Sequence, residues 1–126
     1  MANAVAARSA CDREEFAEEV LRRAFEGIVE NDLSDLTMRQ MAILMSVAAH
    51  TNLNMSDLAL GLDISMSSVS RSVDALSSKG VVRRQRNGKF VNLHITPRGK
   101  AVIGRAIGSI IRYLDRDGLA DAAPRA

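Results

Sequence analysis

The chain has 126 residues, 47% of them apolar and 25% charged, which is ordinary for one globular domain, and residues 1–126 are predicted to form a single domain. It contains no run of about 18 apolar residues and no signal peptide at its start, so the sequence predicts a cytoplasmic protein without a membrane span. The single cysteine, Cys11, excludes an internal disulfide and a cysteine-built zinc site.

Charge is divided unevenly along the chain. Residues 1–36 hold four Arg against nine Asp or Glu, a net charge of −5. Residues 64–105 hold nine Lys or Arg against Asp74 alone, a net charge of +8. Such an excess favours a polyanion as partner, because neutralising phosphates supplies most of the sequence-independent affinity for nucleic acid. The simpler alternative is a solvated basic surface.

The N-terminal part of the chain predicts a flexible start followed by one long helix. Residues 1–11 are mostly small and are expected to be flexible. Asp12 and Glu15 can form a capping box that opens a helix over residues 12–30. Its apolar stripe is wider than one neighbouring surface requires and contains Phe16, Val20, Leu21, Ala24, Phe25, Ile28 and Val29.

A second helix and a helix-turn-helix pair come next. Thr37 and Gln40 predict a capping box for a helix that ends near His50. We expect this helix to support the pair through Met41, Leu44, Met45 and Ala48. Asn54 and Ser65 are N-cap candidates, and they predict two short helices joined by a tight turn.

The second helix of the pair, residues 65–79, has two contrasting faces. Val69, Val73 and Leu76 recur at the spacing of a buried helix face. The opposite face carries short hydroxyls around one guanidinium, and its candidate DNA-binding residues are Ser65, Ser67, Ser68, Ser70 and Arg71. Serine reaches phosphates or base edges, and arginine can bridge O6 and N7 of guanine. The pattern therefore predicts a recognition helix for the major groove of double-stranded DNA, with an ordinary solvated serine face as the alternative.

After this helix the apolar period changes from 3.6 to 2, and Asn87-Gly88 separates two strand-like runs within residues 81–95. Asn-Gly favours a two-residue type I′ turn, in which Arg86 would face Lys89. The hairpin would be apolar at its base and basic at its tip, with no acid to neutralise the tip. A basic hairpin directly after a recognition-type helix is typical of a DNA-binding wing, with the candidate residues Arg84, Arg86 and Lys89. A solvated structural hairpin is the alternative.

A last helix is predicted from Thr96-Pro97, an N-cap followed by a first-turn proline. Its apolar stripe is also broad and contains Val102, Ile103, Ala106, Ile107, Ile110, Ile111 and Leu114. Gly104 and Gly108 weaken a helix by about 1 kcal/mol each relative to Ala, which indicates close approach of another helix. Surplus apolar surface at both ends of the chain predicts a symmetric homodimer, whose dimerisation helices are residues 12–30 and 97–114.

The remaining reactive side chains predict neither an enzyme nor a metal site or cofactor. His50 and His94 are far apart without clustered acids, and we expect His94 on the exposed face of the wing. No pairing of nucleophile with base and no phosphate-cradling glycine motif occurs. Cys11 lies near a helix N-terminus, which favours a thiolate, but acidic neighbours such as Asp12 oppose a redox role. A small-molecule effector stays unassigned, because few aromatic or polar groups are present to line a pocket.

In the order of its predicted helices and strands and in its sequence motifs, the chain resembles the MarR-type winged helix regulators of bacteria. The match covers about residues 36–105 and includes the closing Ile95-Thr96-Pro97-Arg98-Gly99. Its most specific part is the string SVSRSVDALSSKGVV. The resemblance implies a mainly α fold with a small β-hairpin, a winged helix core over residues 37–95 and interlocking terminal helices. It further implies a homodimeric repressor with recognition helices in successive major grooves and wings on the minor groove or the backbone. A plasmid or phage replication protein, or a protein-interaction module of the same fold, is the alternative.

Overall fold

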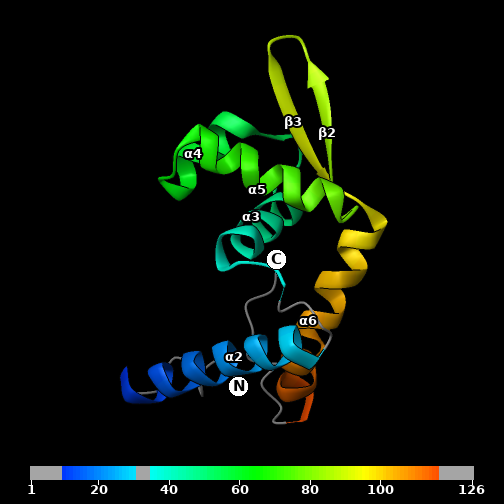
Figure 1. Ribbon diagram of the computed structural model, residues 1–126. Coiled ribbons are helices and arrows are strands. Elements are labelled where there is room, and N and C mark those ends of the chain that lie inside the picture. The colour runs from blue at the N-terminus through cyan, green and yellow to red at the C-terminus, as the bar shows by residue number, and fades with distance from the viewer. Residues whose placement is uncertain (1–9, 31–34, 117–126) are drawn as a thin grey trace. The chain divides into compact units, whose positions relative to one another are not determined.

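A computed structural model describes residues 10–30 and 35–116 of the chain, which form five helices and a small three-stranded sheet (Figure 1). The chain divides into two compact units, which are Met1–Leu33 with Gly104–Ala126 and Ser34–Ile103. The first is called the terminal unit here and the second the central unit. The single domain expected over residues 1–126 stays a prediction.

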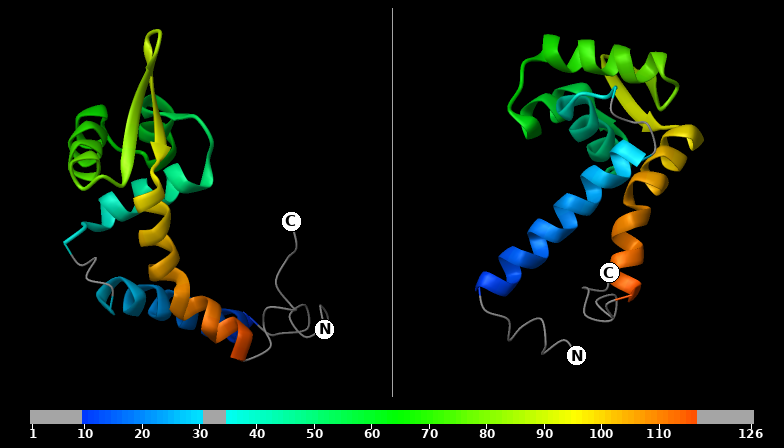
Figure 2. Two further views of the ribbon diagram at one scale, coloured as in Figure 1. Left: turned by 90° about the vertical axis from the view of Figure 1, so that its right-hand side faces the viewer. Right: turned by 60° about the horizontal axis from the view of Figure 1, so that its bottom comes forward.

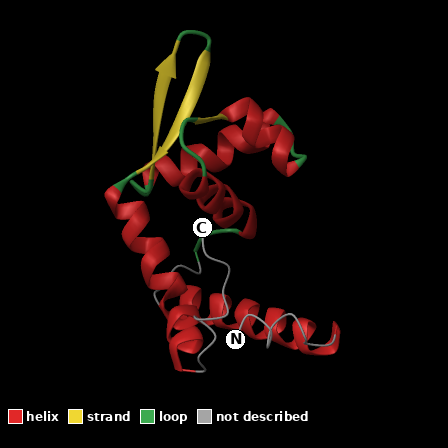
Figure 3. Ribbon diagram, turned by 180° about the vertical axis from the view of Figure 1, so that it is seen from behind, coloured by secondary structure: helices red, strands yellow, loops and turns green. Residues whose placement is uncertain are grey.

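The central unit holds most of the secondary structure. Its elements are α3 (Met38–Ala49), β1 (Leu53–Asn54), α4 (Met55–Leu62), α5 (Met66–Ser78), β2 (Val82–Asn87), β3 (Phe90–Ile95) and the first turns of α6 (Pro97–Arg116). The antiparallel sheet has the order β1-β3-β2, and its β2–β3 hairpin stands out beyond α3, α4 and α5 (Figure 3). The sequence did not indicate β1, because two residues are too few to show alternation.

The core of the central unit lies between its helices and the middle strand, β3. Val69, Val73 and Leu76 of α5 are completely buried, which confirms the predicted inner face of that helix. Leu93 of β3 is also completely buried. On α3 the buried residues are Ile43, Leu44 and Val47.

The face predicted for α3 is therefore wrong at Met45 and Ala48, whereas Met41 is half-buried and Leu44 is buried. Met45 is 42% exposed and Ala48 is exposed, whereas Ile43 and Val47 are buried. Apolar residues surround most of this helix, so their spacing could not select one face.

The helices of the central unit begin at the predicted caps. Thr37 and Gln40 form the capping box of α3. Asn54 Oδ1 accepts the N–H of the third residue after it at 2.7 Å, and Ser65 Oγ does the same at 3.1 Å. Asp63, with a left-handed φ of 54°, closes the turn between α4 and α5. The side chains of Thr37, Asn54 and Ser65 satisfy N–H groups that a helix start leaves without partners, so sequence and local structure agree there.

The hairpin turn lies one residue further along the chain than predicted. Arg86 pairs with Val91, whereas a type I′ turn at Asn-Gly would have placed Arg86 opposite Lys89. The turn residues are Gly88 and Lys89, and only Gly88 has a positive φ, of 63°. A type II′ turn needs glycine at its first central position, so Gly88 fits both turns and the dipeptide did not decide between them. The register moves by two residues, and each side chain keeps its predicted face.

The last helix begins as expected at Pro97. Thr96 Oγ1 accepts the N–H of Gly99 at 3.0 Å and donates to the carbonyl of Gly80 at 2.6 Å. This hydroxyl therefore caps α6 and at the same time joins its start to the residues that end α5.

The terminal unit consists of α2 (Ala10–Glu30) and the later turns of α6 (Figure 2). The two helices approach closely at Gly27, where an added Cβ would lie 2.0 Å from the carbonyl oxygen of Ala106. An added Cβ at Gly104 would meet open space, and one at Gly108 would meet only the guanidinium of Arg112 on the same helix. The close approach expected at Gly104 and Gly108 is thus not made within the described part of the chain.

The predicted flexible N-terminus, residues 1–11, lies outside the described residues apart from Ala10 and Cys11, which belong to α2. The side chain of Cys11 is also outside them. None of the helices within residues 10–30 and 35–116 is long and apolar enough to cross a membrane.

Candidate nucleic-acid interface

Three serine hydroxyls gather at the N-terminus of α5. Ser65 Oγ lies 3.1 Å from Ser67 Oγ and donates to Ser68 Oγ at 3.0 Å. Ser65 and Ser67 are exposed, and Ser68 is half-buried. The N-terminus of a helix carries partial positive charge, so these hydroxyls lie where an anionic oxygen would be stabilised.

The face of α5 opposite the core carries the rest of the predicted site. Arg71 and Asp74 are exposed and Ser70 is half-buried, whereas Ser72 turns toward the core and is only 7% exposed. The predicted separation into a buried apolar face and an accessible polar face is therefore present in the structure.

Arg84 on β2 reaches back from the hairpin to α5. Its guanidinium Nη2 lies 2.5 Å from a carboxylate oxygen of Asp74 and 3.4 Å from the carbonyl oxygen of Ser70. The expectation that no acid neutralises the basic wing is thus wrong for Arg84, because the two positions are distant in sequence and only the fold brings them together. The ion pair joins the hairpin to the helix beside it.

The outer end of the hairpin carries the other predicted cations. Arg86 is exposed near the end of β2, and Lys89 is exposed in the turn. The ammonium of Lys89 lies 5.5 Å from the ring centroid of Phe90, which is itself 47% exposed. The sequence patterns did not single out Phe90, because only the charged side chains near the turn were considered; the position of Phe90 beside the glycine turn was the available signal.

His94 is not on an exposed face, as the sequence suggested. It is half-buried, and its Nε2 atom is buried without a hydrogen-bond partner in the structure. The alternation along β3 places His94 on the face opposite Leu93. That face was expected to be open to solvent, but the fold covers it at this end of the strand.

The end of α5 is tied to the segment before α3. Lys79 Nζ lies 2.6 Å from a carboxylate oxygen of Asp35. This hydrogen bond lowers the pKa of the Asp35 carboxyl below its usual value. Both side chains are substantially exposed, so the pair adds only a small amount to the stability of the unit.

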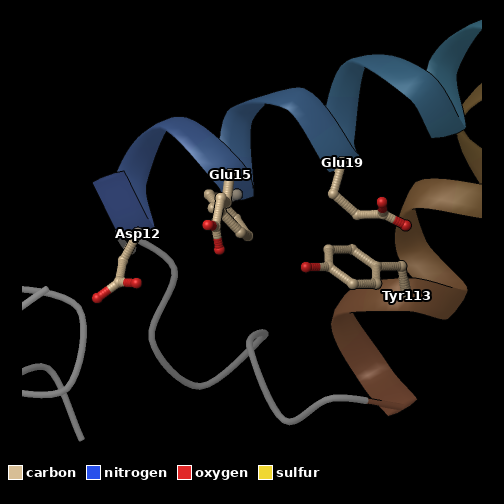
Figure 4. A pocket seen from close by; sticks show the side chains of 5 residues that line it. Asp12, Glu15, Glu19 and Tyr113 are labelled. Carbon is tan, nitrogen blue, oxygen red and sulfur yellow. The ribbon is translucent and has the colours of Figure 1, made fainter. Parts of the chain in front are cut away.

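A second group of charged side chains lies in the terminal unit. Asp12, Glu15 and Glu19 of α2 border an open pocket whose opposite wall is Tyr113 of α6 (Figure 4). Glu19 Oε1 lies 2.5 Å from Arg22 and 2.8 Å from Arg23, and these hydrogen bonds lower the pKa of Glu19. Glu19 is therefore engaged within its own helix. Among the residues described, no group of three or more His, Cys, Asp or Glu has the arrangement of a metal site.

The central unit matches a known protein family. The model of the MarR family matches residues 36–89, from the segment before α3 to the turn of the hairpin. No curated protein matches the chain significantly.

Solved structures share the fold over most of the chain. The transcriptional regulator Tm0710 from Thermotoga maritima has a TM-score of 0.73 and 19% identity, over 92% of this chain and 83% of that one. The MepR–DNA complex of S. aureus has a TM-score of 0.63 and 22% identity, over 90% and 92%. The transcriptional regulator BldR from Sulfolobus solfataricus has a TM-score of 0.55 and 25% identity, over 90% and 87%.

These similarities agree with the predicted fold class, a mainly helical winged helix with a small antiparallel sheet. Proteins of the MarR family are regulators of transcription and not enzymes. The chain is therefore similar to the MarR family over residues 36–89, and it has the fold of that family's winged helix transcription regulators.

Proposed function

We propose that this protein is a sequence-specific repressor of transcription that binds double-stranded DNA as a homodimer in the cytoplasm. In each subunit the recognition helix, residues 65–79, enters the major groove. The wing, residues 81–95, contacts the minor groove or the backbone. The observation that carries the proposal is the exposed face of α5, where hydroxyls and one guanidinium lie beside a basic hairpin.

The chemistry of this face suits a major groove. Ser65, Ser67 and Ser68 present hydroxyls at the N-terminal end of α5, where phosphate oxygens would accept hydrogen bonds. Arg71 lies one turn further along, is exposed, and is long enough to reach base edges. In this arrangement the serines position the helix on the backbone and Arg71 reads sequence. Ser70 directly precedes Arg71, is half-buried, and its carbonyl oxygen accepts a hydrogen bond from Arg84 on the hairpin.

A solved structure of the same fold supports DNA binding. MepR of S. aureus, which shares the fold at a TM-score of 0.63, has been solved as a complex with DNA. The excess of cations between residues 64 and 105 gives this chain the charge that a DNA backbone requires.

The homodimer is supported by apolar surface on the terminal unit. Leu21, Phe25 and Val29 follow one another at four-residue spacing on α2 and are 58%, 44% and 67% exposed. Ile111 of α6 is 47% exposed. A continuous apolar stripe of this kind is unfavourable in water, and a second copy of the chain would cover it through the same surface.

Binding and sequence reading can be tested together. Genomic fragments retained by the full chain would identify preferred sites, and fragments upstream of genes would support a regulator, whereas a replication origin would contradict it. On a retained duplex, Arg71→Ala should cost about 1–3 kcal/mol and reduce discrimination between sites. Arg39→Ala, an exposed arginine on α3, is the matched control and should leave binding unchanged.

Two results would count against this assignment. An equal loss on every duplex would make Arg71 a phosphate contact and remove it from sequence reading. Wild-type affinity for Arg71→Ala would exclude the exposed face of α5 from the interface.

A further inference from the structure

Phe90 is an aromatic side chain with little to pack against at the outer end of the hairpin. It begins β3, directly after the Gly88-Lys89 turn, and is 47% exposed. The other strand residues with large apolar side chains, such as Leu93, turn to the buried side of the sheet. An exposed phenyl ring is unfavourable in water, so its position indicates a surface that covers it.

The neighbours of Phe90 define the chemistry of that surface. Lys89 lies over the ring, and Arg86 is exposed close by on the paired strand. Because Arg86 pairs with Val91, it lies on the opposite face of the ribbon from Phe90. The hairpin end therefore carries a cation on one face, an aromatic ring on the other and a second cation in the turn. A surface that covers all three combines apolar walls with negative charge on both sides.

The minor groove of DNA has this combination, because sugars form its walls and phosphates its rims. We propose that Phe90 enters the minor groove as an apolar contact of the wing, with Arg86 and Lys89 directed to the flanking phosphates. Apolar side chains, phenylalanine among them, are used in this way by proteins that widen or kink the minor groove. This inference rests on the proposed DNA binding and adds to it a contact that carries no charge.

Because Phe90 carries no charge, the salt dependence of DNA affinity distinguishes its contact from that of a cation. Affinity for a duplex retained from genomic fragments is measured against salt for the full chain and for Phe90→Ala. Phe90→Ala should bind roughly tenfold more weakly with the same slope of log affinity against log salt, because the phenyl ring releases no counterions. Phe90→Leu should keep most of the affinity. Met38→Ala removes a side chain that is 75% exposed on α3 and should bind as the wild type does.

A change in the DNA locates the contact. Replacing each G·C pair by inosine·C removes the amino group of guanine from the minor groove and leaves the major-groove pattern intact. If Phe90 lies in the minor groove, this replacement should change the affinity of the wild type and of Phe90→Ala by different factors. The inference would be overturned if the inosine replacement changed both affinities by the same factor, or if Phe90→Ala bound the original duplex as tightly as the wild type. A shallower slope of log affinity against log salt for Phe90→Ala would also overturn it. A wild-type chain that binds no duplex overturns the proposed function as well.

Discussion

Asp74 is the one acidic side chain in a strongly basic region, and it lies on the face of α5 proposed to meet DNA. A carboxylate there would repel phosphates, but the guanidinium of Arg84 lies 2.5 Å from it. The pair therefore has two roles at residue scale, since it neutralises Asp74 and holds the hairpin against the helix.

The ion pair predicts that the effects of replacing Arg84 and Asp74 on DNA affinity are not additive. Arg84→Ala should weaken DNA binding more than the double variant Arg84→Ala with Asp74→Ala, because the single change leaves an unpaired carboxylate facing the duplex. A coupling of about 0.5–3 kcal/mol is expected for groups in direct contact. The measurement is duplex affinity for the two single variants and the double variant. Additive losses would show that the pair does not act at the interface.

A second prediction at this scale concerns Asp35. Lys79 lowers the pKa of the Asp35 carboxyl in the folded chain, so the ion pair contributes stability above the ordinary carboxyl pKa of about 3.9. That contribution is lost as the pH falls through the lowered pKa. Asp35→Asn should therefore unfold at a lower temperature than the wild type at pH 7, and the difference should vanish in strong acid. Glu18→Gln, an exposed carboxyl on α2, serves as control; a difference that persists in acid would contradict the mechanism.

At the scale of elements, the DNA contact proposed for the hairpin depends on its exposed cations. Replacing Arg86 and Lys89 by Ala removes two cations per subunit at its outer end. If both contact phosphates, four contacts are lost per dimer, and the slope of log affinity against log salt should become shallower by about 3 to 4 units. Unchanged affinity and slope would leave the hairpin as a structural element, with recognition resting on α5.

The elements also show how far sequence reasoning extends. Helix starts at Thr37, Asn54 and Ser65 were predictable, because a cap depends on residues within one turn of each other. The buried face of α5 was predictable as well, because polar and apolar residues are clearly separated along that helix. The face of α3 was not, since apolar residues surround it.

Features that depend on contacts between distant residues could not be predicted from the sequence. The partner of Arg84 lies ten positions earlier on another element, and the burial of His94 depends on what covers the far side of β3. The predicted register of the hairpin was wrong for a local reason. Gly88 is compatible with two turn types, and only the pairing along the strands selects one of them. The candidate DNA-binding residues themselves remain predictions, although the fold brings all of them onto α5 and the adjoining hairpin.

At the scale of the whole molecule, the exposed stripe on α2 predicts the oligomeric state. The full chain at micromolar concentration should sediment with twice its mass of 13.6 kDa. Replacing both Leu21 and Val29 by Glu should produce monomers and weaken DNA binding, because each half-site would then be bound separately. Leu60→Glu changes a side chain that is 83% exposed on α4 and should remain dimeric. A monomeric mass for the wild type would exclude this surface as a dimer interface.

The division of α5 into two faces has a consequence for how such proteins diversify. Val69, Ser72, Val73 and Leu76 hold the helix in place, whereas Ser67, Arg71 and Asp74 face outward. If the outward-facing residues read DNA as proposed, different residues serve folding and reading, and a duplicated gene could change its target without losing stability. If the copies kept the stripe on α2, their products would also pair with each other. Such mixed dimers would recognise asymmetric sites, so one substitution at position 71 would add two new binding specificities to the cell.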